Sequence, residues 1–135
     1  MQEHIQNELA SFIANCDWEK IAPHFKEDAA YRVLDWVGCA VAGEHYPQVE
    51  IAQKYFIENG DQGNSTVIGH QIKCSPRTAA FLNGIAGHVC ELDDGHRTAI
   101  GHPGSIAVPT ALALGEHLNA SGADVLKAVI LGYEV

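Results

Sequence analysis

Residues 77–91, RTAAFLNGIAGHVCE, are apolar or small at nearly every position. Gly84 and Gly87 lower the helix propensity of this stretch, so a helix that contains them needs close packing against its neighbours. We therefore predict a buried helix from Arg77 to Glu91, with the rest of the chain packed around it.

Five further helices are predicted on either side of this stretch, from apolar residues that recur at spacings of three and four. The expected ranges are 3–15, 27–41, 47 to about 58, 106–118 and 123–135. In the second of these helices, the apolar stripe consists of Ala30, Val33, Leu34, Val37 and Val41. Gly43 is expected just past its end, and Pro109 is tolerated only near the start of its helix.

The segment 65–69, STVIG, is the one short extended piece that the pattern indicates. The predicted fold class is therefore all-α, a packed multi-helix array with this one extended segment. The last helix still has an unpaired apolar face when the chain stops at Val135. We expect residues 1–135 to be a part of a larger helical domain.

Composition excludes several classes of function. The net charge is −9, and the eight Lys and Arg residues are scattered, so no basic stripe is available for nucleic acid. No apolar run reaches the roughly 18 residues of a membrane helix, and the N-terminus lacks a secretory pattern. The four cysteines are far apart and form no CxxC pair, so free thiols are expected. We expect a cytoplasmic protein.

One window, residues 88–102, concentrates the groups that acid/base chemistry needs. Its ionisable residues are His88, Glu91, Asp93, Asp94, His96, Arg97 and His102. They project from a predicted loop between two apolar helices, the usual placement for functional residues. A carboxylate beside an imidazole shifts its proton affinity, which gives an acid or base that works near neutral pH.

Some of these residues also have a simpler interpretation. Asp93 or Asp94 could cap the helix end or shape the turn before Gly95, and His88 could be a buried core histidine. His102 precedes a constrained Pro-Gly turn and is the best single candidate for a functional role. The His and Asp spacing matches no specific metal-binding motif, so we expect no metal, and a metal-dependent helical hydrolase is the weakest alternative.

Several motifs in the same order resemble the MmgE/PrpD family. They are AAFLNG at 79–84, His88, ELDD at 91–94 and HPG at 102–104, together with DWVGCAVAG at 35–43, STVIG at 65–69 and GYEV at 132–135. The resemblance covers nearly the whole chain. Family members often have Asp where this chain has Glu91 and Thr where it has Gly95, so the substrate stays open.

The resemblance implies a large helical domain with a smaller α/β domain inserted later, working as a homodimer without a metal or organic cofactor. The catalytic residues it implies are His102, Asp93, Glu91 and Asp94. Arg97, His96 and Gly104 are the candidates for substrate binding, with Arg97 able to grip a carboxylate through two hydrogen bonds. The groups that complete the family's site would lie beyond Val135.

The expected reaction is abstraction of a proton next to a carboxylate of a small di- or tricarboxylic acid, as in 2-methylcitrate dehydratase. Epimerisation of an iminodisuccinate-type substrate shares this first step and is the alternative, and decarboxylation also stays open. An alternative of another class is an inactive helical fragment or assembly module that pairs its exposed apolar face.

Overall fold

A computed structural model describes residues 2–135, with side chains from residue 4 onward. The described chain contains six α-helices, one 3-10 helix and one two-stranded sheet. In order they are α1 (Gln2–Asn15), η1 (Trp18–Lys20), α2 (Pro23–Gly43), α3 (Pro47–Glu58), β1 (Ser65–Val67), β2 (Ile72–Cys74), α4 (Pro76–His88), α5 (Gly104–Leu118) and α6 (Gly122–Glu134). The all-α prediction is confirmed. Among these described helices, none is both long and apolar enough to span a membrane.

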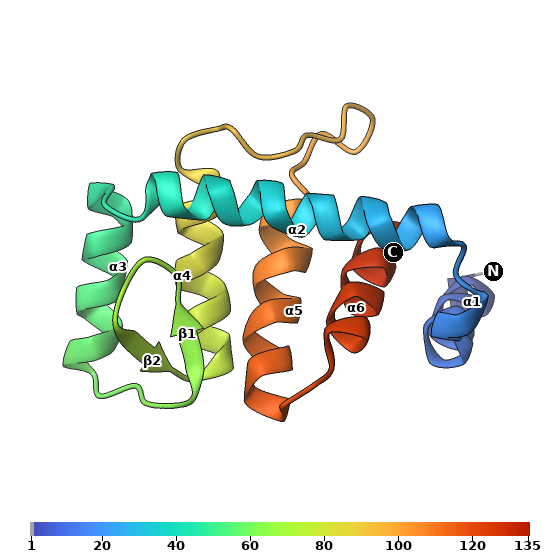
Figure 1. Cartoon of the computed structure of the whole chain (residues 1–135), viewed down its shortest axis with the longest axis horizontal. Helices are drawn as coiled ribbons and strands as arrows, with labels where there is room; N and C mark the ends of the chain where they lie inside the picture. The colour runs from blue at the N-terminus through green and yellow to red at the C-terminus, as the bar shows by residue number, and fades with distance from the viewer. Residues whose placement is uncertain (1) are drawn as a thin grey trace.

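The longest helix, α2, runs across one end of the others (Figure 1). Helices α3, α4, α5 and α6 lie side by side and point away from it, while the β1–β2 hairpin packs in front of α4. The central pair is α4 and α5, and α2 also contacts both. The segment 89–103 connects the α2 end of α4 to that of α5, so both helices present their ends there.

The face that α2 buries consists of small residues and one tryptophan. Ala29, Trp36, Ala40 and Gly43 are buried, whereas Leu34 and Val41 of the predicted stripe are 67% and 49% exposed. Val33 and Val37 of the predicted stripe do pack against the core, but Ala30 is exposed as well, so the buried face is rotated by about one position from the predicted one. The reason is the closeness of α4: a Cβ on Gly43 would lie 2.0 Å from the Ala86 carbonyl oxygen, so larger aliphatic side chains do not fit at the crossing.

The hairpin has a second strand that the sequence pattern missed. Ser65 pairs with Cys74 and Val67 with Ile72 in antiparallel register. The hairpin is attached to the helices through side chains: Asn83 of α4 accepts from the Ile68 N–H and donates to the Thr66 carbonyl, both at 2.9 Å. The attachment to α4 is therefore made by a buried side-chain amide.

Helix boundaries differ from the predictions at three points. Helix α2 begins at Pro23, four residues before the expected start at 27, since proline suits a first helical turn. Helix α4 ends at His88, three residues earlier than expected, and leaves Glu91 in the following loop. Helix α5 begins at Gly104 instead of residue 106, with Pro109 inside it. His88 and the Pro103-Gly104 turn therefore mark the two helix ends beside the loop 89–103.

Candidate active site

Two histidines stand at the facing ends of the central helices. His88 is the last residue of α4, and His102 lies two residues before the start of α5. Their rings meet edge to face, with centroids 4.5 Å apart and planes inclined by 63°. Asp93, in the loop between the helices, lies against both rings. The loop thus brings together residues from both helix ends.

Asp93 is the centre of this cluster, and its side chain has no exposed surface. Nδ1 of His88 lies 3.1 Å and 3.2 Å from its two oxygens. The Ser105 hydroxyl of α5 donates to Oδ2 at 2.5 Å. Nδ1 of His102 lies 3.3 Å from the same Oδ2, but outside hydrogen-bond geometry and without another partner among the described residues. One buried carboxylate therefore organises both imidazoles.

The pKa of Asp93 is lower than its ordinary value. Burial by itself raises the pKa, but the Ser105 hydrogen bond and the contacts with His88 and His102 act in the opposite direction and outweigh it. Asp93 is therefore ionised near neutral pH and can only accept hydrogen bonds. The Nδ1 atom of His88 must then carry a proton, which leaves its Nε2 as the free ring nitrogen.

Glu91 lies at the solvent side of the cluster. The backbone of Glu91 is in the left-handed region, with φ of 53°, and the Glu91 side chain is 74% exposed. The carboxylate oxygen Oε1 lies 3.6 Å from Nε2 of His88. Glu91 therefore faces the side of the His88 ring opposite to the one that Asp93 holds.

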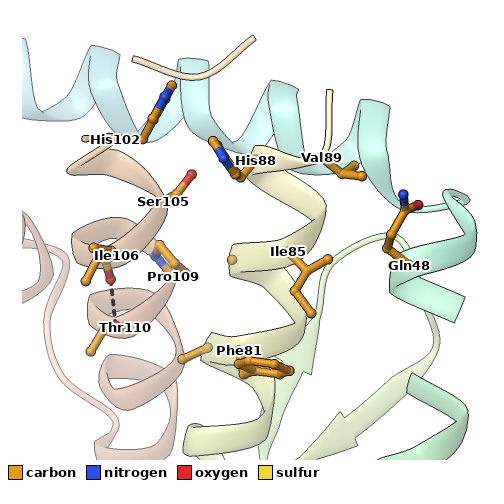
Figure 2. A pocket seen from close by; sticks show the side chains of 12 residues that line it. Gln48, Phe81, Ile85, His88, Val89, His102, Ser105, Ile106, Pro109 and Thr110 are labelled. Carbon is orange, nitrogen blue, oxygen red and sulfur yellow. Dashed lines mark hydrogen bonds between the residues drawn. The ribbon is translucent and has the colours of Figure 1, made fainter. Parts of the chain in front are cut away.

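A cavity of about 660 Å³ opens between α4 and α5 next to this cluster. Figure 2 shows His88 and His102 at one end of it, with Ser105 between them. The remainder of the lining is largely apolar and includes Ala80, Phe81, Gly84, Ile85, Ile106 and Pro109. Of the polar side chains that line the cavity, those of His88, His102 and Ser105 thus lie together at one end, and only those of Gln48 and Thr110 lie elsewhere.

Asp94 points away from the cavity, to the other side of the loop. Its Oδ1 accepts the Gly104 N–H at 3.0 Å and so caps the start of α5. Its Oδ2 lies 3.8 Å from Nη1 of Arg32, whose guanidinium in turn stacks 4.7 Å from the Tyr133 ring centroid. Burial, followed by the neighbouring Asp94 charge, raises the pKa of Tyr133 to about 12. In this chain Asp94 holds α2, α5 and α6 together.

Gly104 belongs to that same contact. A Cβ at this position would lie 2.2 Å from Oδ1 of Asp94 and 2.8 Å from the Tyr133 hydroxyl. Gly104 is buried and does not line the cavity. Its observed role is to let Asp94 approach the helix end.

His96 and Arg97 also lie away from the cavity lining. His96 forms an isolated bridge with Gly101, and its Nδ1 accepts the Ala99 N–H at 2.9 Å, so the ring stabilises a tight turn. Arg97 is exposed in that turn. The loop therefore brings Asp93 and His102 to the cavity, places Glu91 at its edge, and leaves His96, Arg97 and Asp94 outside it.

The structure changes the interpretation of His88 and adds Ser105 to the site. The interpretation of His88 as a core histidine is wrong, because its side chain is 41% exposed and lines the cavity. Ser105 was not singled out, although its position three residues after His102 puts it in the first turn of α5. A hydroxyl one helical turn from a candidate histidine was the available signal.

Comparison with known proteins shows which kind of domain contains these residues. The family profile of the MmgE/PrpD N-terminal domain matches residues 7–135. The chain is 30% identical to the cis-aconitate decarboxylase-like protein oryM of Aspergillus oryzae, over 97% of this chain and 29% of that protein. It is 35% and 34% identical to the cis-aconitate decarboxylases of Homo sapiens and Mus musculus, in each case over 76% of this chain. The chain covers 22% of the length of each mammalian relative.

Proposed function

The chain belongs to the MmgE/PrpD family, and on this basis we propose that it supplies one wall of an active site for proton transfer on a small di- or tricarboxylic acid. The observation that carries the proposal is the buried Asp93 carboxylate, held against His88 and His102 at the polar end of an open cavity. The reaction class is that of a lyase, in line with the names of the relatives.

His102 is the proposed catalytic acid or base. It lines the cavity, and its Nδ1 faces Asp93, so its other ring nitrogen is available to a substrate. In a dehydration, that nitrogen takes the proton next to a carboxylate, and the β-hydroxyl accepts a proton from an acid, for which His88 is the candidate, and leaves as water. In a decarboxylation, the imidazolium delivers a proton to carbon as CO₂ departs. In an epimerisation, the proton returns to the opposite face.

Asp93 is a positioning residue in this mechanism. Its carboxylate lies against Nδ1 of both His88 and His102, and this contact fixes the orientation of each ring. Ser105 holds Asp93 through a short hydrogen bond. His88, on the other side of Asp93, is a second proton carrier within reach of the same cavity.

Substrate carboxylates need cationic or N–H donors, and the described lining of the cavity contains no Lys or Arg; its N–H donors are the imidazoles of His88 and His102 and the Gln48 amide. We propose that residues 1–135 form part of a helical domain and that further donors come from segments such as those the longer relatives possess. Arg97 reaches the substrate, in this proposal, only if its exposed turn closes over the cavity. A homodimeric assembly in the cytoplasm completes the proposal.

The test uses the full-length gene product that contains residues 1–135. It is incubated in deuterated water with 2-methylcitrate, cis-aconitate and iminodisuccinate, and products and deuterium incorporation are followed by proton NMR. We expect turnover of one acid, and a His102→Ala variant should lower its rate by about 10²–10⁴-fold. His96→Ala, at a histidine outside the cavity, is the matched control and should retain activity.

No deuterium exchange and no product with any of the three acids would refute the reaction class. An unchanged rate for His102→Ala would refute the assignment of His102 alone. Comparing Asp93→Asn with His102→Ala separates positioning from catalysis, because the positioning variant should shift the pH profile of kcat as well as lowering it.

A second candidate, an assembly module, is favoured by exposed apolar side chains. Ile5, Phe12, Phe81, Ile106 and Leu118 are each between 49% and 73% exposed. Light scattering of the purified chain tests this alternative, which requires a stable oligomer and no turnover.

A further inference from the structure

Three side chains that commonly bind metals lie together at the polar end of the cavity. One nitrogen of His88, one of His102 and a carboxylate oxygen of Glu91 all lie within 4.8 Å of one another. Nε2 of His88 lies 3.6 Å from Oε1 of Glu91. Neighbouring ligand atoms of a tetrahedral zinc ion lie roughly 3.3 Å apart, given bonds of about 2.0 Å. Small side-chain movements therefore suffice for all three to bind one ion.

Asp93 orients both imidazoles in the way that a metal site requires. It contacts Nδ1 of His88 and lies 3.3 Å from Nδ1 of His102, so the second nitrogen of each ring is available. Metal-bound histidines usually donate their other ring N–H to a carboxylate, which fixes the tautomer and raises ligand basicity. The unsatisfied Nδ1 of His102 would gain this hydrogen bond from a slight ring rotation.

The chemistry of the donors selects the class of ion. Two imidazoles and one carboxylate suit Zn²⁺, Co²⁺ and Ni²⁺, whereas Ca²⁺ and Mg²⁺ prefer oxygen-only ligand sets. We propose that His88, Glu91 and His102 together bind one divalent transition-metal ion. Because both histidines line the cavity, the ion keeps a coordination position open towards it for water or a carboxylate oxygen.

Metal binding at this site would also inhibit the proton-transfer reaction, and this part of the inference rests on the proposed function. The ion occupies the ring nitrogen of His102 that would otherwise exchange a proton with substrate. Zn²⁺ at this site therefore inhibits turnover. Glu91 is the ligand that adds a third donor to the two histidines.

The test is a titration of the metal-free chain with Co²⁺, followed by visible absorption, since four- and five-coordinate Co²⁺ absorbs far more strongly than the hexa-aquo ion. We expect saturation at one Co²⁺ per chain and loss of the bands when Zn²⁺ is added. Glu91→Gln and His102→Gln should each weaken binding by at least about tenfold. His45→Gln is the matched control, because His45 also contacts a glutamate, at 3.4 Å from Glu44, but belongs to no such trio.

Glu91 is largely exposed, so Glu91→Gln keeps the experiment decisive even if His102→Gln disturbs the fold. Absence of saturable Co²⁺ bands, or equal affinity of the parent, Glu91→Gln and His102→Gln, would overturn the proposal. Equal losses in His45→Gln would also overturn it, because the ion would then bind histidines unspecifically. Metal binding is measured without substrate, so a protein that binds Co²⁺ but turns over no acid refutes the proposed reaction and leaves the metal site standing.

Discussion

Replacing Gly87 by alanine tests the packing that places His88. Gly87 lies in α4 immediately before His88, and a Cβ there would lie 2.5–2.7 Å from three ring atoms of Trp36. Ordinary contacts begin at about 3.4 Å, so ring and helix must separate by nearly 1 Å. Overpacking of this kind costs about 1–3 kcal/mol, and the gain in helix propensity offsets at most about 1 kcal/mol. We expect Gly87→Ala to lower the free energy of unfolding by up to about 2 kcal/mol, with about 1 kcal/mol as the central value.

The matched control is Gly38→Ala in α2, where a Cβ would meet nothing within 4 Å. The same substitution there should raise the free energy of unfolding by about 0.5–1 kcal/mol, through helix propensity alone. Urea unfolding followed by circular dichroism measures both values. The midpoint of thermal unfolding should fall by several degrees in Gly87→Ala and rise in Gly38→Ala.

A Gly87→Ala variant as stable as Gly38→Ala would refute the close approach of α4 to Trp36. The functional consequence gives a second readout, because a displaced α4 end moves His88 relative to Asp93. We therefore expect Gly87→Ala also to weaken Co²⁺ binding, while Gly38→Ala leaves it unchanged.

Two further predictions concern stability. The pKa of Tyr133 is raised to about 12, so the fold favours its neutral phenol. This preference stabilises the fold by about 1 kcal/mol after solvent screening. The stabilisation is present below about pH 10 and is lost between about pH 10 and 12. Unfolding curves should show this loss in the parent and in Tyr31→Phe, an exposed control, but much less in Tyr133→Phe. Asn83→Ala should lower the free energy of unfolding by about 2–3 kcal/mol, because it leaves the Ile68 N–H and the Thr66 carbonyl without their partner. A midpoint of thermal unfolding as high in Asn83→Ala as in the control Asn64→Ala would contradict this prediction.

The number and order of the helices were predictable because apolar spacing and turn residues mark them directly. The buried face of α2 was not. Periodicity favours large aliphatic residues such as Leu34 and Val41 as core, but the crossing of α2 over α4 selects Ala40 and Gly43. Hydrophobic pattern describes how much surface a residue can bury, whereas contact distance between two backbones decides which residues fit.

The candidate site was predictable as a segment and not as a geometry. Residues 88–102 do supply both histidines and the buried carboxylate, because they connect the ends of two packed helices. The division of roles between Asp93 and Asp94 depends on which side of the loop each one faces, and adjacent residues with the same chemistry give no signal of this kind. Asp93 turns to the histidines, and Asp94 turns to Arg32 and the start of α5.

The two adjacent aspartates have a consequence for how this loop tolerates change. Together they fasten the end of α4 and the start of α5, so the positions of His88 and His102 depend on residues 93 and 94. The segment 95–100 is exposed and contributes nothing to the cavity lining. Substitutions and insertions in this segment therefore leave the geometry of His88, Asp93 and His102 unchanged. We expect this short turn to be the part of the loop that varies most among proteins of this type.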